Sequence, residues 1–120
     1  MEATLIKTEM LALARAAADK FYADSMGGND WGACGFAWVT IYPSFAHKGN
    51  TRDGKTERKE FEVVMTQLGA RLDYTGKAYQ LWNPSGHHCQ NIDTKEAGAR
   101  AAADVLRKHG FAANAGSRLD

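Results

Sequence analysis

The sequence predicts a single α+β domain, in which three helices pack with one small and mostly antiparallel sheet. The apolar periodicity runs in the order helix, strand, helix, hairpin, helix, strand, so helices and strands do not alternate regularly. A chain of 120 residues with 44% hydrophobic side chains can build one ordinary core, but two domains would each be too small. We therefore expect one domain over residues 1–120.

Residues 4–25 have the apolar periodicity of an amphipathic helix, and Gly27 and Gly28 end it, since glycine tolerates the left-handed conformation of many helix ends. The apolar stripe consists of Ile6, Met10, Leu13, Ala17 and Phe21. Further apolar residues widen it: Leu5, Leu11, Ala14, Ala18 and Tyr22. One small sheet would not cover so wide a stripe, so we expect this helix to lie in an oligomer interface.

Residues 33–42 alternate two sets of side chains, which indicates a strand. One set is Cys34, Phe36, Trp38, Thr40 and Tyr42, and the other is Gly35, Ala37, Val39 and Ile41. Both sets are largely apolar, which predicts a central strand with Cys34 in the core. Pro43 ends the strand, and residues 44–56 form a mildly basic loop of turn residues.

Residues 61–68 have helical apolar spacing, and Gly69 closes this second helix. Residues 71–74 and 77–82 flank Gly76, which predicts a hairpin.

The third helix is predicted to begin at its cap Thr94 and to end before Gly110. Its predicted inner face consists of Ala97, Ala101, Val105 and Leu106. Residues 111–115 add a last short strand, which a tail with Ser117 and Arg118 follows.

The composition limits the possible partners. The chain has 15 basic and 14 acidic side chains, so we expect no long nucleic acid, and any anion site must be local. Neither a membrane-spanning apolar run nor a leader occurs in the sequence, which predicts a cytoplasmic protein. The two cysteines are expected to be reduced thiols.

The common phosphate-loop, dinucleotide, zinc-protease and serine-hydrolase motifs do not occur in the sequence, so we expect no catalytic site, metal or cofactor.

We predict that the loop over residues 82–93 is the functional site and forms part of a nucleotide-binding pocket. Trp82 offers a flat face on which a base can stack. Asn91 can pair with the edge of a purine, Asp93 can accept from ribose hydroxyls, and free amides at the following helix start suit a phosphate oxygen. In the alternative interpretation, Trp82 belongs to the core, and Asn91 and Asp93 are turn and capping residues.

Cations for a phosphate must come from elsewhere in the chain. Arg52 lies in a turn, and Arg118 follows small residues, including Ser117, that would let a ligand approach the backbone. Trp31 is either an exposed aromatic anchor or the first core residue of the strand.

His87, His88 and Cys89 could bind zinc or form a thiolate nucleophile, but adjacent ligands match structural zinc sites poorly. We interpret them as a polar loop with one half-buried thiol.

Several stretches together resemble a known group of small phage proteins. They are residues 31–39 (WGACGFAWV), 82–84 (WNP), 90–93 (QNID) and 116–120 (GSRLD). With the N-terminal helix and the chain length, they resemble the first family of Thoeris anti-defence proteins, which sequester cyclic ADP-ribose signals. The likeness spans most of the chain but rests on pattern and size.

The resemblance implies a homo-oligomer that binds its signal without cleaving it. It assigns the adenine to Trp82, where the family is expected to have phenylalanine, and polar contacts to Asn91, Asp93 and Arg118. It also implies a second site for cyclic di- or trinucleotides, near Gly27, Gly28 and Arg52.

Two other classes of function remain open. A protein-binding inhibitor, similar to anti-CRISPR proteins, would use Trp31, Trp82 and the wide helix stripe as interface anchors. A small nucleotide hydrolase would use His87, His88 and Cys89.

Overall fold

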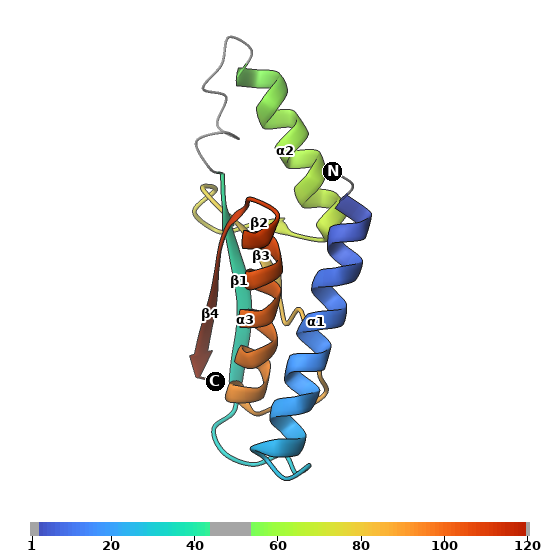
Figure 1. Ribbon diagram of the computed structural model, residues 1–120. Helices are drawn as coiled ribbons and strands as arrows, with labels where there is room; N and C mark the ends of the chain where they lie inside the picture. Colours follow the sequence, from blue (N-terminus) through green and yellow to red (C-terminus); the bar gives the residue numbers. More distant parts are fainter. Residues whose placement is uncertain (1–2, 44–53, 120) are drawn as a thin grey trace.

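The computed structural model describes residues 3–43 and 54–119, and it confirms an α+β fold (Figure 1). The elements in chain order are α1 (Ala3–Asp24), β1 (Gly35–Tyr42), α2 (Gly54–Leu68), β2 (Arg71–Leu72), β3 (Tyr79–Trp82), α3 (Ile92–Lys108) and β4 (Ala112–Leu119). The strands form one antiparallel sheet in the order β2-β3-β1-β4. After α1, the order βαββαβ is that of the split βαβ motif.

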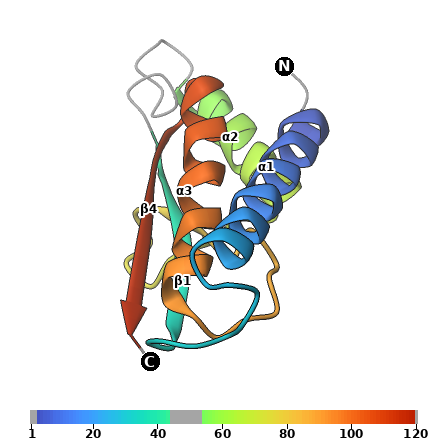
Figure 2. The same ribbon diagram turned by 60° about the horizontal axis from the view of Figure 1, so that its bottom comes forward.

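The helices cover one face of the sheet. Figures 1 and 2 show α3 between the sheet and α1, and α3 packs against both β1 and β4. At α2, the Phe61 ring contacts Tyr79 and Phe111, with ring centroids 5.7 and 6.4 Å apart. The core is built from α1, α2, α3 and the inward residues of the sheet, such as Val39 and Ile41.

Small side chains let the helices and the loop before α3 approach closely. A Cβ at Gly98 would lie 2.6 Å from the Ser85 Cβ and 3.1 Å from the Ala14 carbonyl oxygen. Contacts of this length require a glycine, so Gly98 sets the spacing between α3, α1 and this loop. Ala99, Ala102 and Ala103 continue the same close packing and are fully buried.

Several element predictions need correction. On α1 the buried stripe is Ala3, Ile6, Met10, Ala14 and Ala18, whereas Leu5, Leu11 and Leu13 are exposed. Cys34 is exposed, although it forms a β-bridge with Asn91 just before β1, and Cys89 is buried, so the predicted core position of Cys34 is wrong.

The helices and the last strand also differ in extent. α2 begins at Gly54, earlier than its apolar residues indicate, and the predicted loop over residues 44–56 lies largely outside the described residues. α3 begins at Ile92, and its N-cap is Asn91 rather than Thr94. On α3 the predicted inner residues Val105 and Leu106 are buried, but Ala97 and Ala101 are only half-buried, and Ala99, Ala102 and Ala103 take their place in the core. The predicted tail continues β4 to Leu119, because it pairs with β1 along its length.

Candidate functional site

The face of the sheet turned away from the helices carries an exposed group of aromatic and polar side chains. Side chains alternate along a strand, and directly paired residues share a face. The register therefore assigns ten residues to this open face: Phe36, Trp38, Thr40, Tyr42, Arg71, Gln80, Trp82, Asn114, Gly116 and Arg118, with Ala112 at the end of β4. The exposed fractions are 39% for Phe36, 48% for Tyr42 and 54% for Trp82.

Three aromatic rings on the open face contact one another. The centroids of Trp38 and Trp82 lie 5.1 Å apart at an interplanar angle of 41°. Phe36 meets Trp82 edge to face, with centroids 6.3 Å apart and an angle of 76°. These separations are typical of favourable aromatic pairs, so each ring holds the next in a fixed orientation. We call Phe36, Trp38 and Trp82 the aromatic cluster.

Gly116 allows Trp38 to lie across β4. A Cβ at Gly116 would meet three atoms of the Trp38 indole at 2.8 to 3.0 Å, which is too close for any side chain. The indole therefore rests on the bare backbone of the neighbouring strand instead of standing away from the sheet. The glycine between Ala115 and Ser117 on β4 thus allows the Trp38 indole to lie flat and form an aromatic surface.

Two cations lie over the Phe36 ring at one end of the open face: Arg118 on that face and the buried Lys95 on α3, which packs on the opposite face of the sheet. The Arg118 guanidinium carbon is 6.0 Å from the centroid of the Phe36 ring, and no described acidic side chain forms a salt bridge with it. Lys95 of α3 is buried, and its Nζ donates to the Gly35 carbonyl oxygen at 3.0 Å and lies 5.6 Å from the same centroid. This end of the face is therefore the one suited to an anionic group.

A polar row crosses the sheet next to the aromatic cluster. Gln80, Thr40 and Asn114 are paired across β3, β1 and β4 and share the open face. Within the part of the chain that the structure describes, no hydrogen bond engages the two side-chain amides. Each amide has a donor and an acceptor available for a ligand.

The predicted loop over residues 82–93 is tied to the fold by its own polar groups. Asn91 is buried, its Oδ1 accepts from the Thr94 backbone N–H at 2.8 Å, and its Nδ2 donates to the Trp31 carbonyl oxygen at 2.8 Å. The Asp30 carboxylate accepts from the backbone N–H groups of Gln90 and Asn91. The Ile92 N–H donates to Ala33. The sequence predicts that free backbone N–H groups at the start of α3 bind a phosphate oxygen. The N–H groups of Ile92 and Thr94 are not free, because they already donate to Ala33 and Asn91.

The His87–Cys89 segment also makes bonds within the fold. His87 is buried, its Nδ1 accepts from the Cys89 backbone N–H at 3.2 Å, and its Nε2 lies 3.4 Å from an Asp19 carboxylate oxygen. Burial lowers the pKa of His87 and raises the pKa of the Cys89 thiol. The imidazole therefore bonds the backbone and not the sulfur, and the Cys89 Sγ approaches the Asn91 carbonyl oxygen at 3.8 Å.

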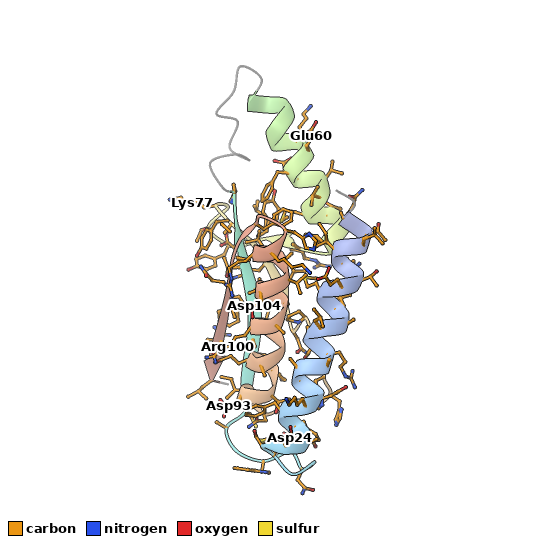
Figure 3. All side chains as sticks on the ribbon, in the orientation of Figure 1. Asp24, Glu60, Lys77, Asp93, Arg100 and Asp104 are labelled. Carbon is orange, nitrogen blue, oxygen red and sulfur yellow. The ribbon has the colours of Figure 1, made fainter. Side chains whose placement is uncertain are left out.

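The remaining predicted residues lie apart from the open face or face away from it. Ser117 points to the helix side of the sheet, where its Oγ donates to Glu96 at 2.5 Å. Asp93 is exposed in the first turn of α3, at the same end of the molecule as Asp24 in Figure 3. Trp31 is 59% exposed, and its indole N–H donates to the Met26 carbonyl oxygen.

The predicted second site is described only in part. Gly27 and Gly28 have φ values of 65° and 74° in the turn after α1, and the Gly28 N–H donates to the Tyr22 carbonyl oxygen. Both conformations favour glycine, so these residues have a clear role in the turn. Arg52 lies outside the described residues.

Of the predicted site residues, Trp82 and Arg118 share the open face. Sequence reasoning did not assign Phe36, Trp38, Tyr42, Gln80 or Asn114 to a site. The signal is the alternation of residues 33–42, but a strand with two largely apolar faces predicts that both faces are buried.

Comparison of the chain with protein-family models, with curated proteins and with solved structures found no match. Among residues 3–43 and 54–119, no group of three or more His, Cys, Asp or Glu side chains could hold a metal ion. None of the described helices is both long enough and apolar enough to cross a membrane.

Proposed function

We propose that the protein binds nucleotides without cleaving them, through bases that stack on the open face of its sheet. The observation that carries this proposal is the aromatic cluster, which is exposed, held in place by ring contacts and flanked by Arg118, an arginine that pairs with none of the described acidic side chains. Stacking of one base on an aromatic side chain contributes about 1–3 kcal/mol. Arg118 provides the fork of donors that fits phosphate oxygens, and the amides of Gln80 and Asn114 can pair with base edges.

The specific form of this function that the sequence resemblance suggests is a phage anti-defence protein. In that form, the protein sequesters a cyclic ADP-ribose signal in the cytoplasm of the infected bacterium, and it also accepts cyclic di- or trinucleotides. Trp82 and Arg118 would hold the base and the phosphates. Binding of this kind requires no nucleophile, metal or cofactor, because the signal is removed by sequestration and not by reaction.

Calorimetry with cyclic ADP-ribose isomers and cyclic dinucleotides tests the proposal. We expect heat of binding with at least one of these ligands, and a ligand at 100 times its Kd should add about 2.7 kcal/mol to the free energy of unfolding. Mass spectrometry should recover the bound nucleotide unchanged. If none of these ligands gives heat of binding or raises the Tm, the proposal that the protein sequesters these signals is wrong.

A matched pair of tryptophan variants tests where the base binds. Trp82 and Trp31 are 54% and 59% exposed, but only Trp82 lies on the open face. Trp82→Leu should weaken binding by about 5- to 150-fold, which is the stacking energy converted to affinity. Trp31→Leu should leave the affinity unchanged. Equal losses in the two variants would contradict the proposed surface.

We also propose that the outer side of α1 binds a second copy of the chain. A groove of about 470 Å³ between α1 and α3 is lined by Glu9, Leu13, Ala16 and Lys20, among others. Along α1 these four residues are spaced symmetrically about the midpoint between Leu13 and Ala16. In an antiparallel pair of α1 helices, Glu9 of one copy therefore faces Lys20 of the second copy, and Leu13 faces Ala16. Glu9 also pairs with Lys108 and His109 of its own chain, so Lys20 would join an existing charged group. This self-complementarity is what a two-fold interface needs.

Light scattering on the purified chain tests this interface. Leu13→Glu places a charge near the centre of the proposed interface between the two α1 helices and should therefore give a monomer. Val63→Glu is the control, because Val63 is similarly exposed but lies on α2. A wild-type chain that stays monomeric at concentrations well above those used in the calorimetry would overturn the proposed α1 interface.

A further inference from the structure

We infer that the open face binds an extended single-stranded oligonucleotide of about three nucleotides, in preference to a single nucleotide. The inference rests on the proposed stacking of bases on this face, but not on cyclic ADP-ribose as the ligand. It follows from how the aromatic and polar side chains are arranged along β1 and across the sheet.

The spacing along β1 favours bases that are separated from one another. Phe36, Trp38, Thr40 and Tyr42 occupy alternate positions of one strand, so successive side chains lie about 6.6 Å apart. Stacked nucleotides in a duplex rise by about 3.4 Å each. Bases seated on successive positions of β1 would therefore be unstacked from each other and stacked on the protein, which only a single strand allows.

The strand register divides the open face into four levels with different chemistry. Phe36 pairs with Arg118 at the first level, and Trp38 lies between Trp82 and Gly116 at the second. Both levels offer an aromatic surface for a base.

The third and fourth levels continue the same face. Thr40 lies between Gln80 and Asn114 at the third level, where amide groups can pair with a base edge, and Tyr42 at the fourth offers another ring. From the first to the fourth level the face extends about 20 Å along β1. This length suits three bases, on Phe36, on the two tryptophans and beside Tyr42, with the amides between the second and the third.

Arginines lie on both edges of the same face. Arg118 is on β4, and Arg71 is on β2, where it pairs with Gln80. Phosphates that link bases along β1 therefore have a guanidinium within reach from either edge strand. The formal net charge of the chain is only +1, so attraction for a long polyanion is weak and the preference is for a short segment.

A length series of oligonucleotides tests the inference. Tryptophan fluorescence or calorimetry would measure the affinity for adenosine monophosphate and for oligoadenylates of two, three, four and six nucleotides, as RNA and as DNA, with a blunt duplex as control. We expect each nucleotide up to the third to strengthen binding by about fivefold or more, and further nucleotides to add less than about twofold. The duplex should bind more weakly than the trimer. A tighter RNA series would indicate a contact with the 2′-hydroxyl.

Variants at the two ends of the face locate the added bases. Tyr42→Leu should remove about fivefold of the gain from monomer to trimer and leave monophosphate binding unchanged, because Tyr42 lies outside the aromatic cluster. Phe36→Leu changes the cluster itself and should weaken the binding of both monophosphate and trimer. Tyr74→Leu is the control, since Tyr74 is fully exposed on the turn between β2 and β3, away from the face. Equal affinities for monophosphate and trimer would overturn this inference and leave the proposed function intact. No binding of either ligand would likewise overturn this inference, and it would overturn the proposed function too if the cyclic nucleotides also failed to bind.

Discussion

Asn91→Ala should destabilise the protein rather than remove a ligand contact. The sequence suggested a purine-binding role for Asn91, but its amide is 2% exposed and bonds the chain with both ends. Its Oδ1 caps α3 by accepting from the Thr94 N–H at 2.8 Å and from the Thr94 Oγ1 at 3.0 Å. Its Nδ2 donates to the Trp31 carbonyl oxygen at 2.8 Å, which ties the loop before β1 to the start of α3.

These contacts determine the size of the expected effect. Loss of an asparagine N-cap costs about 0.5–2 kcal/mol. The Thr94 hydroxyl is then left buried without its acceptor, which adds about 1–3 kcal/mol. The Trp31 carbonyl lies close to solvent and regains a partner in water, so it adds little. The sum is about 1.5–5 kcal/mol, and a value near the middle, about 3 kcal/mol, corresponds to about 10 °C in Tm for a domain of this size.

Urea unfolding followed by circular dichroism measures this change. Asn91→Asp should lie between the wild type and Asn91→Ala, because a carboxylate still caps the helix but cannot donate to Trp31. Asn114→Ala is the control: Asn114 is exposed on the open face, and its loss should change the free energy of unfolding by less than about 0.5 kcal/mol. If Asn91→Ala instead unfolds like the wild type but loses nucleotide binding, Asn91 is a ligand contact and not a structural residue.

Three further outcomes follow from the packing. Gly98→Ala should lower Tm, because the added Cβ would lie 2.6 Å from the Ser85 Cβ, and a rise in Tm would show that this packing is looser than described. A thiol reagent should modify Cys34 in the native protein and Cys89 only after unfolding, which a thiol titration with and without urea measures. The lowered pKa of His87 means that the unfolded chain takes up more protons, so stability should fall as pH drops below about 6.5, and unfolding at two pH values checks this.

The fold was largely predictable because the local patterns agree with the final packing. The glycines after α1 and α2 and the alternation of β1 mark element boundaries that do not depend on distant contacts. The length of β4 was not predictable, because its residues have weak strand propensity and are held by pairing with β1. The inner face of α3 was predictable at Val105 and Leu106 but not among its alanines, since a helix rich in alanine has apolar residues on every side.

The site was less predictable than the fold. The chemistry of Trp82 and Arg118 predicts both as ligand residues, and the register of β1 with its two neighbours brings them to one face. No local pattern distinguishes an exposed aromatic face from a buried one. The difference depends on the helices, which cover only the face that carries Val39 and Ile41.

The arrangement on the open face argues for a ligand with alternating apolar and polar parts. The core is complete on the helix side, so exposed rings of this size are not needed for folding. In a surface for a protein partner, the apolar residues form a centre and the polar residues form a rim. Here the polar row of Gln80, Thr40 and Asn114 passes between the aromatic cluster and Tyr42, through the middle of the face. A chain of bases joined by phosphates matches that order, because each base has a stacking surface and a polar edge.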